Sequence, residues 1–339
     1  DEYAIIKHRV EARREKRAFL SLESARANPQ ICNWSEYIPP APNKPEIQTI
    51  EPTLEELIPY IDWSPYFMTW ELAGKFPRIL QDEVVGEAAT SLWEDTQERL
   101  NWLVKDGRLQ CRGVVGIWPA NRLGSDDIRV YTNEERNEPL VDLYHLRQQA
   151  PKPDDLSPNL CLADFIAPVG VPDYLGGFAV TSGGNLENIL EDFPNDDFNQ
   201  IMIKALADRF AEAFAEYLHE RVRCDFWGYA ANEEMDNEGL IKERYRGIRP
   251  APGYPACPEH SEKETLFALL NATPKTGIEL TESFAMSPAA AVSGWYFSHP
   301  EAKYFGVGKI DEDQLSDYAA RKQWTPELAR QRLQPCLVD

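Results

Sequence analysis

The stretch that most constrains this chain lies between Arg246 and His260 and reads RGIRPAPGYPACPEH. Its four prolines fix φ and remove backbone donors, so neither a helix nor a central strand can run through it. Each proline also favours an extended conformation in the residue before it. Gly253 supplies a flexible joint among them. The sequence therefore predicts a stiff, extended loop with helices entering and leaving it.

This loop carries groups that suit ligand contact. Arg249 offers a planar guanidinium that fits a carboxylate. The backbone N–H groups of Ala251, Tyr254 and Ala256 are candidate hydrogen-bond donors. Proline-rich loops more often serve as rigid connectors between helices. The concentration of Pro, Gly, Tyr, Arg, Cys and His in so few residues supports a ligand-facing loop equally well.

The segment RPAPGYPACPEH at 249–260 resembles the signature loop of the activation domain of cobalamin-dependent methionine synthase. Further blocks resemble those of the same family and follow in the family's order: YIDWSPYF at 60–67, GVVGIWPAN at 113–121, ALADRFAEAF at 205–214 and SGWYFSHP at 293–300. Together the blocks cover nearly the whole chain from about Glu46 onward. A match of this length is far more specific than a single short motif.

The resemblance implies a fold and a domain organisation. The family fold is α+β, a single C-shaped domain with a twisted antiparallel sheet flanked by helices. Residues 46–339 would form that domain, which binds S-adenosylmethionine. Residues 1–45 would be a linker from a preceding cobalamin-binding domain, because a basic, helical segment is followed there by prolines at 39, 40, 42 and 45. The start at Asp1 rather than at a methionine fits a fragment of a longer enzyme.

Local patterns favour the same class, because the order of helices and strands is too mixed for a regular series of βαβ units. Thr53-Leu-Glu-Glu56 has the spacing of a capping box and predicts a helix start, and Ser64-Pro65 predicts another. The longer expected helices are 82–106, 199–222 and 237–245. The expected strands are 112–119, 127–132, 140–146, 162–167, 174–181, 277–285, 291–299 and 303–310, the last two joined as a hairpin through Pro300-Glu301.

Acidic side chains outside the loop are further candidates for ligand contact. On sequence alone Asp62 would cap the second helix, whereas the resemblance implies that it binds the amino group of the ligand. Glu212, Glu216 and Glu220 form a row at i, i+4 spacing, which is typical of a solvated acidic face. Glu212 lies next to the packed face of its helix and Glu243 comes close to the loop, so both enter the predicted ligand set.

Two aromatic residues complete that set. Tyr304 and Phe305 follow the turn at Pro300-Glu301 and could be ordinary strand aromatics, whereas the family's matching tyrosine presents its hydroxyl to a cleft. An amino acid with a sulfonium and an adenine needs a receptor for its carboxylate, its amine and its base. The predicted ligand-binding residues are Asp62, Glu212, Glu243, Arg249, Ala251, Tyr254, Tyr304 and Phe305.

Composition and motifs argue against other classes. The formal net charge of -21 would repel nucleic-acid phosphates but tolerates a cationic sulfonium. The sequence contains no Walker loop, no G-x-G-x-x-G after a strand, no G-x-S-x-G and no H-E-x-x-H. The histidines lack metal-ligand spacing and the cysteines lack a C-x-x-C pair, so we expect no metal in this chain. Zinc is expected only in another domain of the parent enzyme. We also expect reduced thiols in a cytoplasmic protein. No apolar run reaches the length of a membrane span.

The leading functional hypothesis, implied by the resemblance, is reductive reactivation of methionine synthase. S-adenosylmethionine bound here would supply methyl to reduced cobalamin held by another domain, so the isolated chain would bind without catalysing. The parent enzyme is a methyltransferase that moves a methyl group from methyltetrahydrofolate to homocysteine. One alternative is a separate module that reactivates another corrinoid protein without catalysis of its own. Another is a self-contained methyltransferase of unusual fold.

The resemblance also implies partners. These are the cobalamin-binding domain of the same enzyme and an electron donor, flavodoxin or a similar reductase. Flavodoxin is acidic, as is this chain, so docking would need a local basic patch. The candidates are the basic run from Lys7 to Arg17 and the side chains of Arg244 and Arg246.

Overall fold

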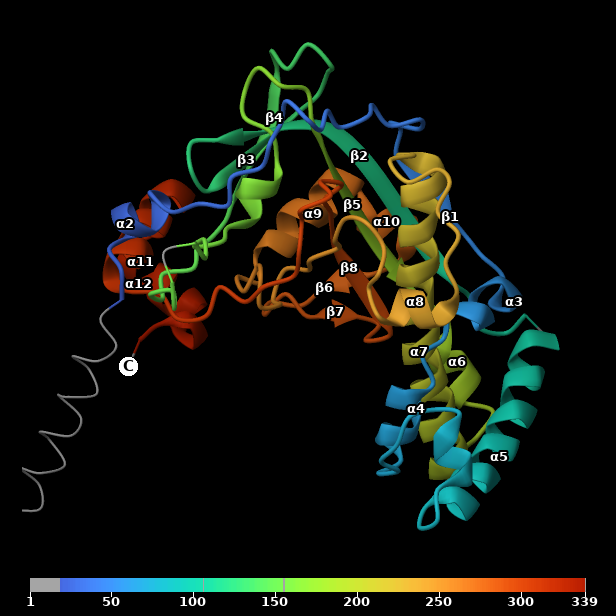
Figure 1. Ribbon diagram of the computed structural model, residues 1–339. Helices are drawn as coiled ribbons and strands as arrows, with labels where there is room; N and C mark the ends of the chain where they lie inside the picture. Colours follow the sequence, from blue (N-terminus) through green and yellow to red (C-terminus); the bar gives the residue numbers. More distant parts are fainter. Residues whose placement is uncertain (1–18, 106, 155, 339) are drawn as a thin grey trace, which may run out of the picture.

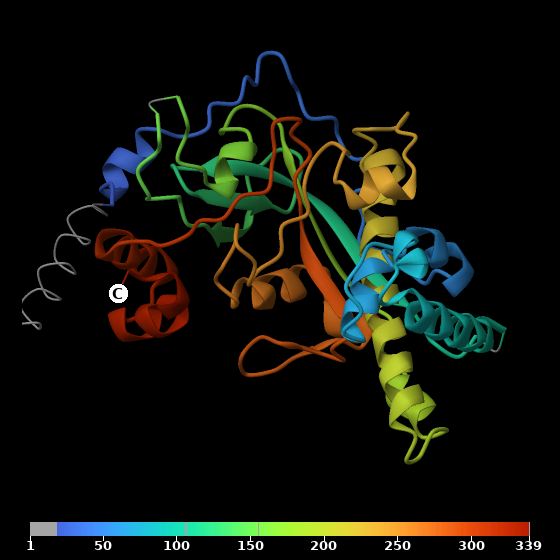
Figure 2. The same cartoon turned by 60° about the horizontal axis from the view of Figure 1, so that its bottom comes forward.

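The computed structural model describes residues 19–105, 107–154 and 156–338. The predicted linker helix and basic run before residue 19 lie outside these ranges. An open antiparallel sheet forms the top of an arch, with a helical arm at one end and the C-terminal helices at the other (Figures 1 and 2). This arrangement confirms the expected α+β class and the C-shaped domain.

The main sheet follows the order β4-β3-β2-β5-β8, with β1 also paired to β2. Its neighbouring strands are antiparallel throughout. The first part of β2 pairs with β1 and β5, and its last residues pair with β3. The strands are β1 (Gln48–Ile50), β2 (Arg112–Leu123), β3 (Asp127–Tyr131), β4 (Pro139–Tyr144), β5 (Tyr174–Thr181) and β8 (Ala291–Tyr296), with β6 (Glu279–Leu280) and β7 (Met286–Ser287) as a separate two-stranded sheet.

The longest helices, α5 (Gly86–Lys105) and α7 (Asp197–Arg221), build the helical arm (Figure 1). The other α-helices are α2 (Leu22–Arg26), α3 (Leu54–Leu57), α4 (Ser64–Thr69), α6 (Leu186–Leu190), α8 (Asn237–Ile241), α9 (Glu262–Leu270), α10 (Ala272–Thr276), α11 (Glu312–Lys322) and α12 (Pro326–Leu333). Short 3-10 turns occur at η1 (Ile58–Tyr60), η2 (Arg78–Gln81), η3 (Leu162–Phe165) and η5 (Gln334–Cys336), and a π-helical turn, η4 (Val222–Phe226), follows α7.

Both faces of the central strands are covered. Successive side chains of a strand point to opposite sides, so neighbouring residues enter different cores. In β2, Val115 joins a core shared with α3, α5 and α7, and Val114 joins a second core shared with η3, α9 and α10. A further cluster joins α11 and α12. Burial on both faces explains why the 113–121 block is a nearly continuous apolar run.

Helix α7 carries much of the candidate site, and its placement follows from local chemistry. The Asp196 side chain caps its start by accepting from the Asn199 N–H at 3.1 Å. Its apolar side packs on β5 and β8. Gly113 of β2 leaves room for the Phe214 ring, because a Cβ there would lie 2.7 Å from it. The helix is therefore held closely against the sheet, with its other side free to line a site.

Some expected elements are confirmed and others are wrong. The capping box at Thr53 and the strands at 112–119, 127–132, 140–146, 174–181 and 291–299 are confirmed within a few residues. The strand expected at 162–167 is instead the turn η3, and that at 277–285 is reduced to β6. The segment 303–310 is not a strand and does not pair with β8, because β5 occupies one edge of β8 and the backbone of Ile248 and Pro250 bonds to the other. The segment bonds instead to the proline-rich loop, through Val307 N and Pro255 O at 2.8 Å.

The segment 19–45 runs along the outside of the domain and is attached at several points. Arg26 forms ion pairs with Asp126 and Asp317, at 2.6 and 2.7 Å. Lys44 pairs with Asp225 at 2.8 Å. The domain boundary at residue 45 stays a prediction.

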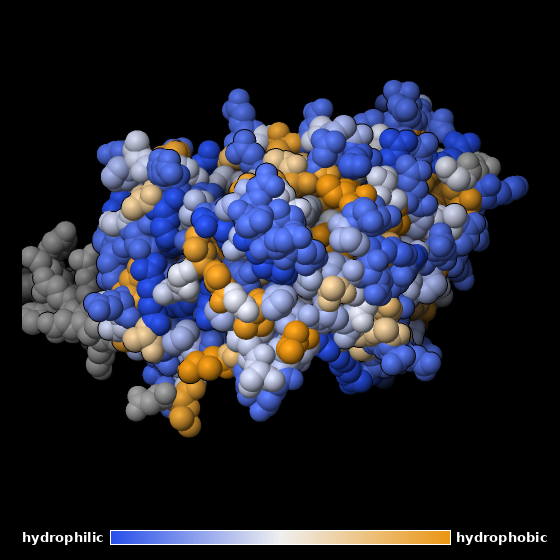
Figure 3. Space-filling view, turned by 90° about the horizontal axis from the view of Figure 1, so that it is seen from above, coloured by the Kyte–Doolittle hydropathy of each residue, from blue (hydrophilic) through white to orange (hydrophobic). Residues whose placement is uncertain are grey.

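Hydrophilic side chains dominate the face that is seen from above, and the apolar side chains on it lie in small groups (Figure 3). Among the described helices, none combines the length and the apolar character needed to cross a bilayer.

Candidate functional site

The proline-rich loop is neither helix nor strand, as predicted, and lies between β8 and the segment 303–310. Its middle is not extended as expected, because turns form at 252–253 and 255–256. Pro250 O accepts from the Trp295 N–H at 2.8 Å, and Pro255 O accepts from the Val307 N–H at 2.8 Å. A Cβ on Gly294 would lie 2.9 Å from Pro250 O, so this close approach of loop and strand requires glycine there. The loop is therefore fixed on both sides by hydrogen bonds rather than by its prolines alone.

A tight turn shapes the middle of the loop. Gly253 has φ +92, a value that favours glycine, and its N–H donates to Cys257 O at 2.7 Å. The Tyr254 N–H donates to Ala251 O at 3.1 Å, so it is not the free donor that the sequence suggested. Within the described ranges, no protein acceptor contacts the N–H of Ala251 or Ala256. These two donors remain available beside the cavity that both residues line.

A cavity of about 680 Å³ opens along this loop, within the size range of small-molecule sites. It brings together most of the predicted ligand set: Glu212, Glu243, Arg249, Ala251, Tyr254, Tyr304 and Phe305. Asp62 lies instead in an adjoining hollow of about 160 Å³, and Glu212 lines both spaces. Residues from α7, from the loop and from the 303–310 segment thus meet at one place.

Arg249 is held by several neighbours at the edge of this cavity. Its backbone N–H donates to the Tyr304 hydroxyl at 3.0 Å. Its guanidinium donates to Glu216 Oε1, to the Tyr245 hydroxyl at 3.2 Å, and lies 3.4 Å from His219 Nδ1. Burial alone would lower the pKa of Arg249, but the negative charge of Glu216 reverses this and raises it. Arg249 therefore keeps its charge while only 15% of its side chain is exposed.

The two carboxylate oxygens of Asp62 can serve the two roles considered for it, capping of α4 and binding of a ligand amine. Its Oδ1 accepts from the Ser64 N–H at 2.9 Å, next to the start of α4. In the part of the chain that is described, its Oδ2 has no hydrogen-bond partner. The Asn237 side chain donates to Ile61 O at 3.1 Å and so ties α8 to the segment that carries Asp62. One carboxylate oxygen is thus structural and the other can face a ligand.

The acidic lining adds negative charge around the cavity. Glu212 is exposed on α7. Glu243 follows α8 in a left-handed conformation with φ 52, which is uncommon for a residue with a side chain. Burial raises the pKa of Glu243, and the nearby Arg249 opposes that shift. Such strained positions are often found at functional sites.

Sequence reasoning missed two residues behind Arg249. Glu216 was interpreted as part of a solvated row, yet only 16% of its side chain is exposed and it pairs with Arg249. His219 is fully buried, and its ring stacks on Tyr296 with 5.1 Å between centroids. The spacing of 212, 216 and 219 places all three near one side of α7, a signal that is visible in the sequence.

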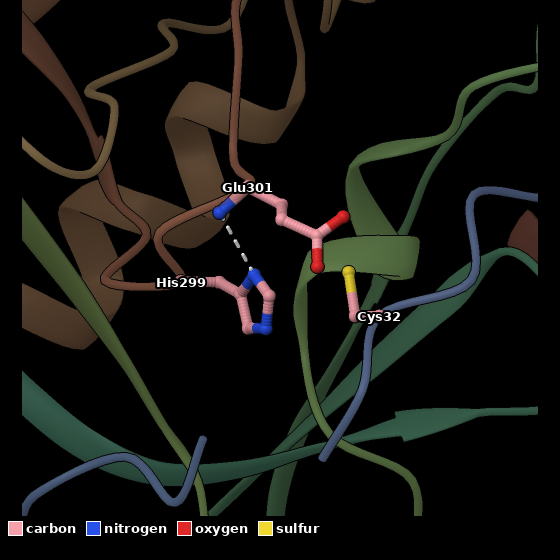
Figure 4. Close-up of side chains that lie close together, drawn as sticks. All are labelled: Cys32, His299 and Glu301. Atoms are coloured by element: carbon pink, nitrogen blue, oxygen red, sulfur yellow. Dashed lines mark hydrogen bonds between the residues drawn. The ribbon is translucent and has the colours of Figure 1, made fainter. Parts of the chain in front are cut away.

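One group of possible metal ligands among the described residues lies outside the cavity lining: Cys32, His299 and Glu301, with ligand atoms within 4.8 Å of one another (Figure 4). His299 Nδ1 accepts from the Glu301 N–H at 3.1 Å, which places the proton of a neutral ring on Nε2. A metal-bound imidazole needs a free nitrogen lone pair. Burial also raises the pKa of Cys32 to about 12, which disfavours a thiolate. We therefore assign no metal to this group.

Comparisons with known proteins show the family to which the chain belongs. Residues 53–323 match a family model described as the activation domain of vitamin B12 dependent methionine synthase. Among solved structures, the chain is similar to a crystal structure of the MetH reactivation domain bound to AdoHcy. The two share 52% sequence identity with a TM-score of 0.92, over 95% of this chain and 99% of that one. The chain belongs to the family of activation domains of vitamin B12-dependent methionine synthases.

Proposed function

We propose that this chain binds S-adenosylmethionine in the cavity along the proline-rich loop and presents its methyl group to reduced cobalamin during reactivation of methionine synthase. The observation that carries the proposal is the convergence of Arg249, the acidic side chains and the loop on one cavity. The similar solved structure is bound to AdoHcy, which is S-adenosylmethionine without its methyl group. Cavity and relative thus support the same ligand class.

Each part of the ligand would find a matching group. Arg249 would receive the carboxylate through its guanidinium, because a planar fork suits a planar anion. The free Oδ2 of Asp62 would accept from the ammonium group. Glu212 and Glu243 would favour the positive sulfonium. The adenine would lie against the loop at Ala251 and Tyr254, and Tyr304 with Phe305 would border the reactive end.

The chemistry divides between this chain and the cobalamin domain. Reduced cobalamin, held by another domain of the parent enzyme, supplies the nucleophile for the methyl group. The residues of this chain bind and orient the sulfonium, and no acid or base among them is required. The proposal is therefore that the isolated chain has binding activity only, although its family belongs to a methyltransferase.

The cobalamin domain is the partner that the family implies, and a reductase such as flavodoxin is a further proposed partner in the cytoplasm. Of the two arginines suggested for reductase docking, Arg246 is a poor candidate. Its guanidinium donates to Ser298 O at 3.2 Å and to Tyr229 O at 3.1 Å, and it packs over Tyr37. Arg244 is exposed and better suited to contact an acidic protein.

If Arg244 contributes to docking, reversing its charge should weaken flavodoxin binding several-fold, about as expected for a single exposed ion pair. Arg244→Glu should also reduce the dependence of affinity on salt, because one screened attraction is lost. Binding would be measured across a salt series. Arg330→Glu, an exposed arginine of α12, controls for net charge. Equal binding by the two variants at every salt concentration would contradict a role for Arg244.

Replacing Asp62 by asparagine should weaken S-adenosylmethionine binding by about tenfold, because a charge-assisted hydrogen bond to the ammonium is lost. Titration calorimetry on the purified chain would measure this. Asp82→Asn is a matched control, since Asp82 Oδ1 likewise accepts from a nearby backbone N–H, at 2.9 Å, but is not a lining residue of either space. A wild-type chain that shows no binding would refute the proposed function itself.

A further inference from the structure

We propose that Glu216 is a positioning residue for the candidate ligand site and that it keeps the guanidinium of Arg249 directed towards the cavity. The inference rests on the proposed function and extends it to a residue outside the predicted ligand set. Glu216 accepts from Arg249 Nη2 through Oε1, and both side chains are about five-sixths buried. The ion pair is therefore shielded from water, and this shielding makes it stronger than an ion pair on the surface.

The position of Glu216 allows it to do this without occupying the side of the guanidinium that faces the main cavity. It lines the smaller hollow with Asp62 rather than the main cavity. Arg249 lines the main cavity, so the ion pair crosses the wall between the two spaces. Glu216 therefore approaches the guanidinium from behind and leaves its cavity side for a carboxylate.

His219 supports the same orientation from one turn further along α7. Its Nδ1 lies 3.4 Å from Arg249 Nη1, and arginine can only donate, so this nitrogen carries a lone pair. Burial and the charges of Arg223 and Arg249 lower the pKa of His219 well below its usual range. The imidazole is therefore neutral and does not repel the guanidinium. Glu216 supplies the charge and His219 supplies a neutral acceptor.

The need for a fixed anion follows from the acidic lining. Glu212 and Glu243 border the same cavity as Arg249. A flexible guanidinium without its own counter-charge would turn to one of these carboxylates and occupy the space meant for the ligand. Glu216 prevents this by pairing with Arg249 on the far side. Its function is thus to leave both the arginine and the acidic lining free for the zwitterionic end of the ligand.

Glutamine at 216 has the size of glutamate but no charge, so it tests this role directly. Glu216→Gln should weaken S-adenosylmethionine binding by about tenfold, the loss expected when one charged partner of a buried hydrogen bond becomes neutral. Binding of 5′-methylthioadenosine should not change, because this probe has the nucleoside and sulfur but no carboxylate or ammonium. In an Arg249→Ala background, Glu216→Gln should have no further effect, since it acts through Arg249.

Glu220→Gln, one turn along α7, is the matched control and should bind both ligands as the wild type does. The thermal midpoint of each variant shows that it is folded at the titration temperature. Wild-type or tighter affinity in Glu216→Gln would overturn the inference, because Glu216 would then be idle or a competitor of the ligand. An equal loss for 5′-methylthioadenosine would also overturn it, because it would indicate a distorted cavity. Absence of binding by the wild type would reject the proposed function instead.

Discussion

Replacing Arg249 by alanine is expected to weaken S-adenosylmethionine binding by between about tenfold and a hundredfold, or about 1.5–3 kcal/mol. The guanidinium would meet the ligand carboxylate where only 15% of the arginine side chain is exposed, so water competes poorly for the contact. Alanine removes this contact and leaves Glu216 without its counter-charge. The effect should therefore exceed that of any other single substitution in the cavity.

The matched variants separate charge from geometry. Arg249→Lys keeps the charge but loses the planar fork, so its affinity should fall between those of the wild type and Arg249→Ala. Arg244→Ala removes an exposed arginine from the same segment and should bind as the wild type does. Calorimetric titration of the three variants gives the comparison. Unchanged affinity in Arg249→Ala would mean that the ligand carboxylate binds elsewhere.

The proline-rich loop and helix α7 could be predicted because their constraints are local. Prolines at fixed positions exclude helix and strand, and the period of the apolar residues in α7 is visible over its whole length. The segment 303–310 could not be predicted in this way. Its alternation of apolar and small residues suits a strand, but one edge of β8 pairs with β5 and the other bonds to Ile248 and Pro250. The carbonyl of Pro255 provides the segment with a partner elsewhere. Strand pairing is decided by which edge is free, and a single segment does not show this.

The candidate site was predicted to a similar degree. Seven of the eight predicted residues line the main cavity, and Asp62 lies in the adjoining hollow. That they contact a ligand stays a prediction. Glu216 was missed because the default for an acidic row on a helix is solvent exposure. Its burial depends on Arg249, which lies 33 residues further along the chain and reaches back to α7 only in the folded domain. A contact of this kind has no local signature.

The largest loss of stability is expected from replacing Arg147, which lines neither of the two spaces of the candidate site. Its side chain is 1% exposed, and each of its five N–H groups has an acceptor. Nε donates to Asp126 at 2.7 Å, and the two terminal nitrogens donate to both oxygens of Asp164, at 2.9 and 2.8 Å. They also donate to Asn159 O at 2.7 Å and Ser125 O at 2.8 Å. The guanidinium thus joins the turn before β3 to η3 and to the residues just before η3.

Arg147→Met should cost roughly 3–5 kcal/mol of unfolding free energy, because it leaves the fully buried carboxylate of Asp164 without this partner. Adding Asp164→Asn should recover part of the loss, since the uncompensated charge is removed with its partner. Arg129→Met is the matched control: its pair with Asp142 is 31% and 23% exposed and should contribute less than about 1 kcal/mol. Denaturant unfolding of the four proteins measures these differences. Similar midpoints for Arg147→Met and Arg129→Met would show that burial of the network adds nothing to the free energy of unfolding. A recovery in the double variant would identify the unpaired carboxylate as the source of the loss.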